Sequence, residues 1–157
     1  MRSKIFTIGL LTLLLTSCGY EPVFEQYQSI PDDSWSKESV VTFDIPITDT
    51  VQLYDLYINV RNLNSYPFSN LYLFVNVAAP NGDQLTDTLE YRLADDYGKW
   101  IGSKSSRIWD SKLPYRGTVK FAQTGTYSFN IRHGMRNNSL EGISDVGITL
   151  ENSTTNQ

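Results

Sequence analysis

YDLYINVR, residues 54–61, is the stretch that decides the fold expected for this chain of 157 residues. Its side chains alternate, so that one face carries the mainly apolar Tyr54, Leu56, Ile58 and Val60. The other face carries Asp55, Tyr57, Asn59 and Arg61. A period of two is typical of a β-strand that buries one side. The stretch therefore predicts a sheet with one face against a core.

The same period recurs along the chain, at residues 41–47, 71–78, 85–93, 119–121, 127–133 and 146–150. Asn81-Gly82 is a strong hairpin signal, because both residues tolerate positive φ. Pro46 cannot donate a ladder hydrogen bond, so its strand belongs at an edge or a bulge. A short helical turn is expected around residues 105–111. We predict an all-β fold, a single antiparallel β-sandwich of seven or eight strands, jelly-roll or immunoglobulin-like.

The N-terminus has the layout of a secretory signal peptide, with Arg2 and Lys4 before a mostly apolar run at residues 5–15. That run is too short to span a bilayer, which needs about 20 residues. It ends at Leu15-Thr-Ser-Cys18, which resembles the lipobox of bacterial lipoproteins. The resemblance implies that the thiol of Cys18, the only cysteine, receives a diacylglycerol before cleavage. The alternative is a plain signal peptide with an unrelated cysteine nearby.

The chain is expected to divide into a signal peptide (1–17), the lipidated cysteine and a tether (18–34), a β-sandwich domain (35–151) and a polar tail (152–157). The predicted tether shows no period and contains Pro22 and Pro31. Fully extended, it would reach about 50 Å. We therefore expect a domain that can stand away from the membrane.

The acidic charge balance limits the classes of partner. The net charge is −4, and the loss of Arg2 and Lys4 with the signal peptide makes it −6. This balance argues against nucleic acid, which binds basic patches, and against the domain lying on anionic lipid. Membrane attachment is then expected from acyl chains such as palmitate on Cys18.

Few residues suit catalysis or metal binding. His133 is the only histidine and lies on the apolar face of its predicted strand, which favours a hydrogen-bonded core or rim residue. One histidine and one lipidated cysteine cannot complete a usual zinc site, and the acidic pairs at residues 32–33 and 95–96 suit turns better than a calcium loop. Residue types leave a Ser-His-Asp site or a carboxylate-pair glycosidase open, with nothing in favour of either. We expect no enzyme activity, no metal and no cofactor.

Aromatic side chains on the outer face of the two clearest strands are the candidate binding surface. If residues 54–61 and 71–78 share one sheet, a single outer face carries Tyr57, Asn59, Tyr72, Phe74 and Asn76. Such a face would suit a protein or a sugar, and we assign partner binding to Tyr57, Tyr72 and Phe74. The alternative is that the long loop after residue 94 covers these rings.

Several stretches resemble the gliding-motility lipoprotein family GldH of the Bacteroidota. They are YQSIPDDSW (27–35), YPFSNLYLF (66–74), DTLEY (87–91), GKWIG (98–102), GTY (125–127) with Met135-Arg136, and EGISDVGI (141–148). The resemblance implies an accessory lipoprotein of the cell envelope, associated with gliding and the linked type IX secretion apparatus, and not an enzyme. It transfers one functional residue, Cys18. Residues 19–22 lack the acidic cluster of surface-exported lipoproteins in this phylum, which favours the periplasmic side of the outer membrane.

Two function classes follow. The first is a non-catalytic envelope lipoprotein that binds other envelope proteins of a motility or secretion complex, through a broad aromatic patch with a polar rim. The second is a carbohydrate-binding module on a lipid anchor, with one or two rings in a groove beside acids and amides.

Overall fold

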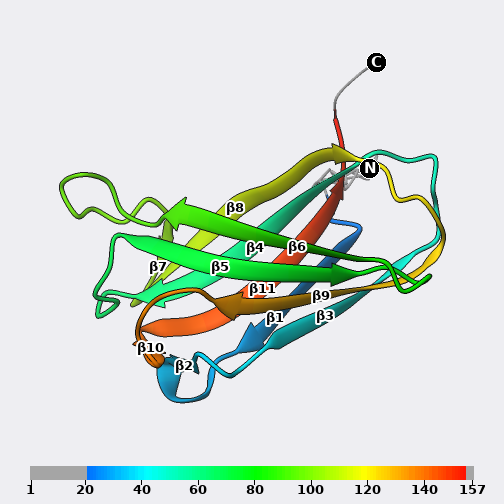
Figure 1. Cartoon of the computed structure of the whole chain (residues 1–157). Helices are drawn as coiled ribbons and strands as arrows, with labels where there is room; N and C mark the ends of the chain where they lie inside the picture. The colour runs from blue at the N-terminus through cyan, green and yellow to red at the C-terminus, as the bar shows by residue number, and fades with distance from the viewer. Residues whose placement is uncertain (1–20, 155–157) are drawn as a thin grey trace, which may run out of the picture.

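The computed structural model describes residues 21–154, which form antiparallel sheets (Figure 1). The first sheet has five strands in the order β1 (Phe24–Ser29), β11 (Ile143–Asn152), β4 (Tyr54–Leu63), β8 (Ile108–Val119) and β7 (Ser103–Ser105). The second has four, in the order β3 (Val41–Ile47), β9 (Gly125–His133), β5 (Asn70–Ala78) and β6 (Gln84–Arg92). A short pair joins β10 (Ser139–Glu141) to β2 (Ser34–Ser36), which follows the 3₁₀ turn η1 (Pro31–Asp33).

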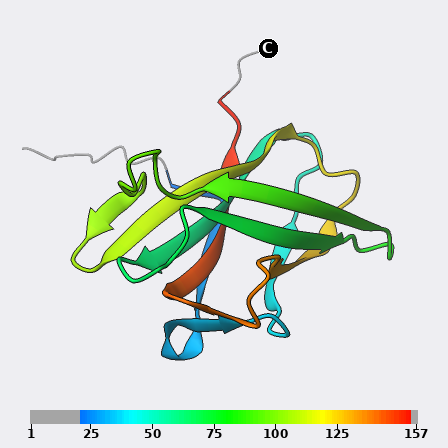
Figure 2. The same ribbon diagram turned by 60° about the vertical axis from the view of Figure 1, so that its left-hand side comes forward.

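Alternation of apolar side chains along the strands builds a core between the two larger sheets, whose layers are seen at an angle in Figure 2. Along β3, every second side chain is buried, from Val41 to Ile47. The first sheet contributes Leu56, Ile58, Val146, Ile148 and Leu150, and the second contributes Phe43, Leu73, Val75, Phe129 and Ile131. Full burial of one such side chain stabilises the fold by about 1.5–3 kcal/mol. The prediction of an all-β, sandwich-like fold is confirmed.

The predicted number of strands is wrong, because residues 21–154 contain eleven strands. Three of the missed strands, β2, β7 and β10, have three residues each, too few to display a period. The predicted helical turn near residues 105–111 is also wrong. That segment is the β7–β8 hairpin, in which Ser106 turns the chain with a φ of 57°.

The predicted tether differs most from the structure. The backbone N–H of Val23 donates to the carbonyl of Leu150 (2.8 Å), and β1 pairs with β11 over its whole length. β1 escaped prediction because it is an edge strand in which only Phe24 and Tyr27 are half-buried, at a spacing of three. The domain boundary predicted at residue 35 therefore moves to residue 23. At the other end, β11 runs to Asn152 and Ser153 donates its N–H to Leu53 (2.8 Å), so part of the predicted polar tail belongs to the sheet.

Two local predictions are confirmed. β3, which contains Pro46, lies at the edge of the four-stranded sheet, a position at which a strand tolerates proline. Asn81-Gly82 turns the β5–β6 hairpin, with Gly82 at a φ of +90°.

The two clearest strands do not share a sheet. β4 belongs to the five-stranded sheet and β5 to the four-stranded one, and the chain crosses between the layers at residues 64–69. Periodicity identifies which face of a strand is buried, but it does not identify the strand's neighbour.

Side chains of β6 and β8 join the two sheets along one side of the sandwich. The Tyr91 hydroxyl donates to the carbonyl of Pro114 (2.9 Å), while Tyr115 and Arg116 both donate to Asp87 (2.7 Å each). Burial raises the pKa of Tyr91 to about 12, so its hydroxyl keeps its proton at neutral pH. These contacts keep the two layers in a fixed relation along that side.

Candidate functional site

The structure separates the three residues assigned to partner binding. Tyr57 lies on the outer face of the five-stranded sheet, whereas Tyr72 and Phe74 lie on the outer face of the four-stranded sheet. The predicted common face is therefore wrong. The long loop after residue 94 is not what lies closest to the Tyr72–Phe74 pair: a Cβ atom built on Gly134 would lie 3.1 Å from the Phe74 ring.

Tyr57 is occupied by contacts within its own sheet. The ammonium of Lys112 lies 4.2 Å from the centre of the Tyr57 ring and donates to Glu151 (2.5 Å). Beside this group, the buried amide of Asn59 donates to Thr149 (2.6 Å). These contacts within the sheet explain why Tyr57 is half-buried. Nothing in its described surroundings indicates a ligand.

The aromatic groove lies at one end of the four-stranded sheet and has a volume of about 520 Å³. We define it by its lining residues, which are Phe68, Tyr72, Gly134, Met135, Arg136 and Asn137. Tyr72 is 37% exposed, which is high for an aromatic side chain on a sheet. The groove is thus an open apolar depression with an arginine and an amide at its rim.

Backbone contacts hold the loop after β9 against β5 and so shape the aromatic groove. The N–H of Gly134 donates to the carbonyl of Tyr72 (2.7 Å), and the N–H of Tyr72 donates to the sulfur of Met135 (3.4 Å). Phe68 packs edge-on against the buried ring of Tyr66, with 5.7 Å between the ring centres. The Tyr66 hydroxyl donates to the carbonyl of Asn70 (2.8 Å). These hydrogen bonds and ring contacts hold the residues that line the groove in place.

A second hollow, the amide hollow, lies farther along the same outer face and has a volume of about 510 Å³. Its lining residues are Val40, Thr42, Phe74, Asn76, Thr86, Asn130 and Arg132. Thr42 donates to Asn130 (2.9 Å) and Asn76 donates to Thr86 (3.0 Å). Each amide thus retains hydrogen-bonding capacity for a ligand, next to the face of one aromatic ring.

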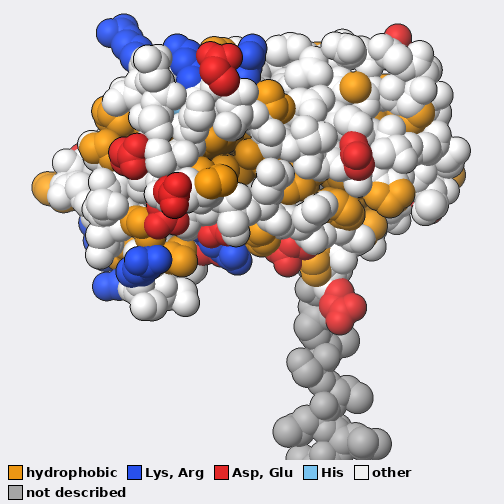
Figure 3. Space-filling view, turned by 90° about the horizontal axis from the view of Figure 1, so that it is seen from below, with side chains coloured by type: hydrophobic (Ala, Val, Ile, Leu, Met, Phe, Trp, Pro, Cys, Tyr) orange, Lys and Arg blue, Asp and Glu red, His pale blue; other side chains and the backbone are white. Residues whose placement is uncertain are grey.

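Unpaired arginines flank both hollows. Among residues 21–154, the four ion pairs use other cations, and neither Arg132 nor Arg136 takes part. The Arg132 guanidinium lies 5.6 Å from the centre of the Phe74 ring. In the view from below, Lys and Arg side chains gather toward the left of the molecule, the side of the β4–β5 crossing, while the right half shows few charges (Figure 3).

Glu90, the acid that is hydrogen-bonded to Tyr72, also accepts a hydrogen bond from Asn70. A hydrogen bond to Glu90 raises the pKa of the Tyr72 hydroxyl, and hydrogen bonds from Asn70 and Tyr72 lower the pKa of Glu90. Glu90 is therefore charged and satisfied at neutral pH, and it does not neutralise Arg136 or Arg132 through an ion pair. The rim of the aromatic groove keeps its positive charge.

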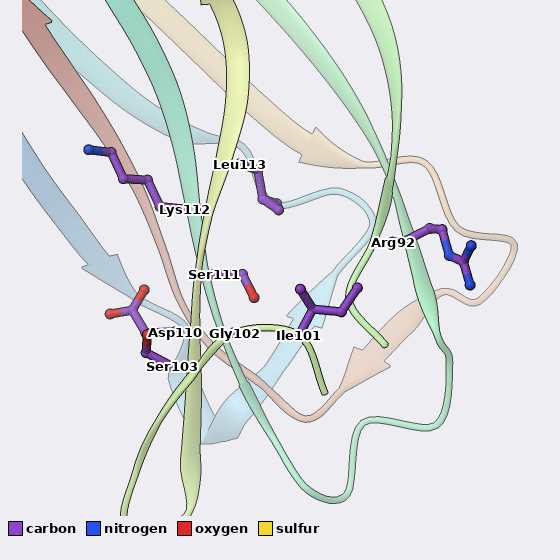
Figure 4. A pocket seen from close by; sticks show the side chains of 8 residues that line it. All are labelled: Arg92, Ile101, Gly102, Ser103, Asp110, Ser111, Lys112 and Leu113. Carbon is purple, nitrogen blue, oxygen red and sulfur yellow. The ribbon is translucent and has the colours of Figure 1, made fainter. Parts of the chain in front are cut away.

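A third pocket lies between the end of β6 and the start of β8 (Figure 4). Ser111 and Leu113 point toward Ile101, while Asp110 and Lys112 point to the opposite side of β8. Within residues 21–154, the buried Ser111 hydroxyl has no hydrogen-bond partner. Gly102 passes so close that a Cβ atom there would lie 2.6 Å from this hydroxyl. A serine without a base beside it is not an activated nucleophile.

His133 is fully buried, as predicted, but the expected hydrogen bond is absent within residues 21–154. Neither ring nitrogen has a side-chain or backbone partner of good geometry, and the ring packs edge-on against Trp35 with 5.4 Å between centres. Burial lowers the pKa of His133, an effect that the Trp35 backbone opposes and the charge of Lys37 increases. The histidine is therefore neutral, and within residues 21–154 no serine hydroxyl is hydrogen-bonded to it.

The acidic pairs occupy turns. Asp95 accepts the N–H groups of Tyr97 and Lys99 (2.9 Å each), and Asp32 and Asp33 turn the chain at η1 with φ values of 56° and 51°. Over residues 21–154, no group of three or more histidine, cysteine or acidic side chains is arranged to hold a metal ion.

The remaining predicted sites lie at the N-terminus. Cys18 and the predicted signal peptide fall outside the described residues, so both remain predictions. Within residues 21–154, no helix is both long enough and apolar enough to cross a bilayer.

Sequence reasoning missed Phe68, Met135 and Arg136, because these residues lie between strands, where no period exists. The signal that could have found them was the resemblance itself, since two of its stretches contain these three residues. The structure brings those stretches, far apart in the chain, to the same groove.

Comparison with known proteins identifies the family to which this chain is similar. A family model described as GldH lipoprotein matches residues 22–150, which covers all the strands except the last two residues of β11. The chain belongs to the GldH lipoprotein family. The protein named gliding motility lipoprotein GldH from Flavobacterium johnsoniae is 42% identical, over 96% of this chain and 98% of its own length. The protein named gliding motility lipoprotein GldH homolog from Christiangramia forsetii is 40% identical, over 98% of this chain and 99% of its own length.

Two solved structures of a viral protein are distantly similar to this chain. The crystal structure of the infectious bursal disease virus VP2 subviral particle matches 96% of this chain with a TM-score of 0.33 and 13% identity. The structure of the Gx strain of that virus gives a TM-score of 0.35 and 15% identity. This chain spans 43% and 37% of the two viral chains. Nothing about function is drawn from them.

Proposed function

We propose that this chain is a non-catalytic lipoprotein of the cell envelope, anchored by acyl chains on Cys18, that binds another envelope protein of a gliding-motility or type IX secretion complex. Family membership and the names of its relatives support the gliding association. The aromatic groove is the observation that carries the binding role. It combines an exposed Tyr72 with Phe68 and with Arg136, which forms no ion pair among residues 21–154.

The groove favours a partner of definite chemistry. Its apolar floor suits an aromatic or aliphatic anchor, and Arg136 and Arg132 suit carboxylates beside that anchor. One well-buried anchor is worth about 2 kcal/mol, or about 30-fold in affinity. An acidic segment with a single large apolar side chain is therefore the expected occupant.

Substitutions that remove the aromatic side chain or reverse the positive charge of the groove test this proposal. Tyr72→Ala and Arg136→Glu should each reduce recovery of crosslinked envelope partners from cells, because the first removes the floor and the second repels carboxylates. Tyr97→Ala and Arg107→Glu are matched controls, since Tyr97 is 97% exposed and Arg107 is an exposed arginine outside the groove. Equal recovery for all four variants and wild type would show that the groove does not bind.

The proposed location is the periplasmic face of the outer membrane. Labelling cells with a fatty-acid analogue should mark the wild-type protein and leave Cys18→Ala unmarked. External protease should spare the protein in intact cells and cut it after the outer membrane is opened. Equal labelling of the two proteins would end the lipid assignment, and digestion in intact cells would end the assignment of the face.

The absence of catalysis is part of the proposal. Its support is local: in the described part of the chain, the Ser111 hydroxyl and both nitrogens of His133 are buried without hydrogen-bond partners. Loss of a measurable hydrolase activity in a folded His133→Leu variant would overturn it.

A second candidate function, carbohydrate binding, is favoured by the amide hollow. Phe74 lies there beside Asn76, Asn130 and Arg132, the ring-and-amide arrangement expected of a sugar site. Titration calorimetry with envelope oligosaccharides should then give heat that Asn130→Ala and Phe74→Ala abolish. No heat with the wild-type protein would remove this candidate and leave the protein-binding role.

A further inference from the structure

The start of strand β1 determines how far the domain can lie from its anchor. Val23 already pairs with Leu150 through its N–H (2.8 Å), so at most residues 19–22 separate Cys18 from the sheet. From Cys18 to Val23, five residues span at most about 17 Å when fully extended. The lipid anchor proposed above therefore permits only a short separation.

The end of the sandwich where β1 begins is defined here as the anchor end. β1 starts there, β11 ends there and β4 starts there, since Phe24 pairs with Leu150 and Asn152 pairs with Tyr54. Neighbouring strands lie about 4.8 Å apart, so the start of β4 lies about 10 Å from the start of β1. The N-terminal and C-terminal ends of the described chain lie together at this end in Figure 1.

The anchor end also displays apolar side chains. Val51, at 78% exposure, and Val23, at 49%, are among the most exposed large hydrophobic residues of the described chain. Asp49 accepts the N–H groups of Val51 (2.7 Å) and Gln52 (3.1 Å), which holds the loop that carries Val51. Exposed apolar residues beside a lipid anchor fit the apolar–polar boundary of a bilayer.

The aromatic groove lies at the opposite end. β4 runs from Tyr54 at the anchor end to Leu63, and the chain then crosses to Phe68 in the groove. At about 3.3 Å per residue, β4 alone separates the two ends by about 30 Å.

From this geometry we infer that the anchor end, with Val23 and Val51, faces the lipid surface, and that the aromatic groove faces away from the bilayer. The inference rests on the lipid anchor proposed above. It replaces the expectation of a domain on a long tether. The partner then meets the domain in the aqueous compartment, about 30 Å or more from the lipid surface.

Fluorescence resonance energy transfer from a labelled residue to an acceptor in the membrane tests this orientation. Because acyl chains block Cys18, a second cysteine is the only free thiol, so Val51→Cys and Asn137→Cys each accept one fluorophore in the acylated full-length protein. Both residues are exposed, the first at the anchor end and the second at the groove. In phosphatidylcholine vesicles with a headgroup acceptor, transfer should be several-fold higher from position 51 than from position 137. Equal transfer, or higher transfer from position 137, overturns the inference.

A linker variant separates the tether from direct lipid contact. A Gly/Ser insert of about ten residues after Gly19 should lower transfer from position 51 toward that from position 137. Unchanged transfer would overturn the account based on linker length. Failure of the unmodified protein to float with the vesicles overturns the lipid anchor itself, and the orientation with it. Flotation with equal transfer overturns the orientation alone.

Discussion

Replacing Gly142 with alanine should destabilise the domain strongly. Gly142 has a φ of +88° and lies directly against Tyr66, because a Cβ atom there would be 2.7 Å from the Tyr66 nitrogen and 2.8 Å from its Cα. Both of its backbone groups are also engaged, since its N–H donates to Asp33 and its carbonyl accepts from Leu63 (2.8 Å each). The backbone therefore cannot move aside without loss of hydrogen bonds.

Two costs add in the Gly142→Ala variant. Positive φ costs a residue with a side chain about 1–2 kcal/mol. Overpacking against rigid backbone costs about 1–3 kcal/mol more. The expected loss is about 2–5 kcal/mol in the free energy of unfolding, or about 4 °C in Tm for each kcal/mol.

Gly82→Ala is the matched control. Gly82 has nearly the same φ, +90°, but nothing lies within 4 Å of an added Cβ atom. Urea denaturation of the two variants and the wild type, followed by far-UV circular dichroism, should give a loss of about 1–2 kcal/mol for Gly82→Ala. The excess loss in Gly142→Ala measures the contact with Tyr66. Equal losses in the two variants would refute this reasoning.

Two further predictions concern pH. Burial lowers the pKa of His133 below its ordinary 6.5, so the unfolded chain binds the proton more readily and the domain should lose stability as the pH falls below about 6.5. His133→Leu should flatten that slope in urea titrations between about pH 7 and pH 5, and an unchanged slope would assign it to other groups. Burial of Asp87 acts to raise its pKa, but hydrogen bonds from Arg116 and Tyr115 outweigh it and lower the pKa below 3.8. The stabilisation by Asp87 is then present above about pH 4 and lost as the pH falls through the folded-state pKa, so Asp87→Asn should be less stable at neutral pH and show a shallower acid transition. A parallel acid transition in Asp87→Asn and wild type would contradict this assignment.

Sequence patterns predicted the site only in part. Outward-facing positions for Tyr72 and Phe74 followed from the period of two, and the structure places both on an outer face. Phe68, Met135 and Arg136 could not be found in the same way, because their loops have no periodic backbone. Tyr57 was misplaced for a different reason: its face was right, but its sheet was wrong.

The sequence alone determined the local features of this protein. Alternation fixed the buried face of β3, β4, β5 and β9, Pro46 limited β3 to an edge or a bulge, and Asn81-Gly82 placed a hairpin. Each of these depends only on Cβ direction, on a missing N–H or on allowed φ. Only the tertiary structure decided which strands are neighbours. β1 pairs with β11 across more than 115 residues of chain, and that pairing depends on backbone hydrogen bonds rather than on a side-chain pattern. That pairing shortened the expected tether. The assignment of β4 and β5 to different sheets separated Tyr57 from Tyr72, and the pairing of β5 with β9 brought two distant loops together at the aromatic groove.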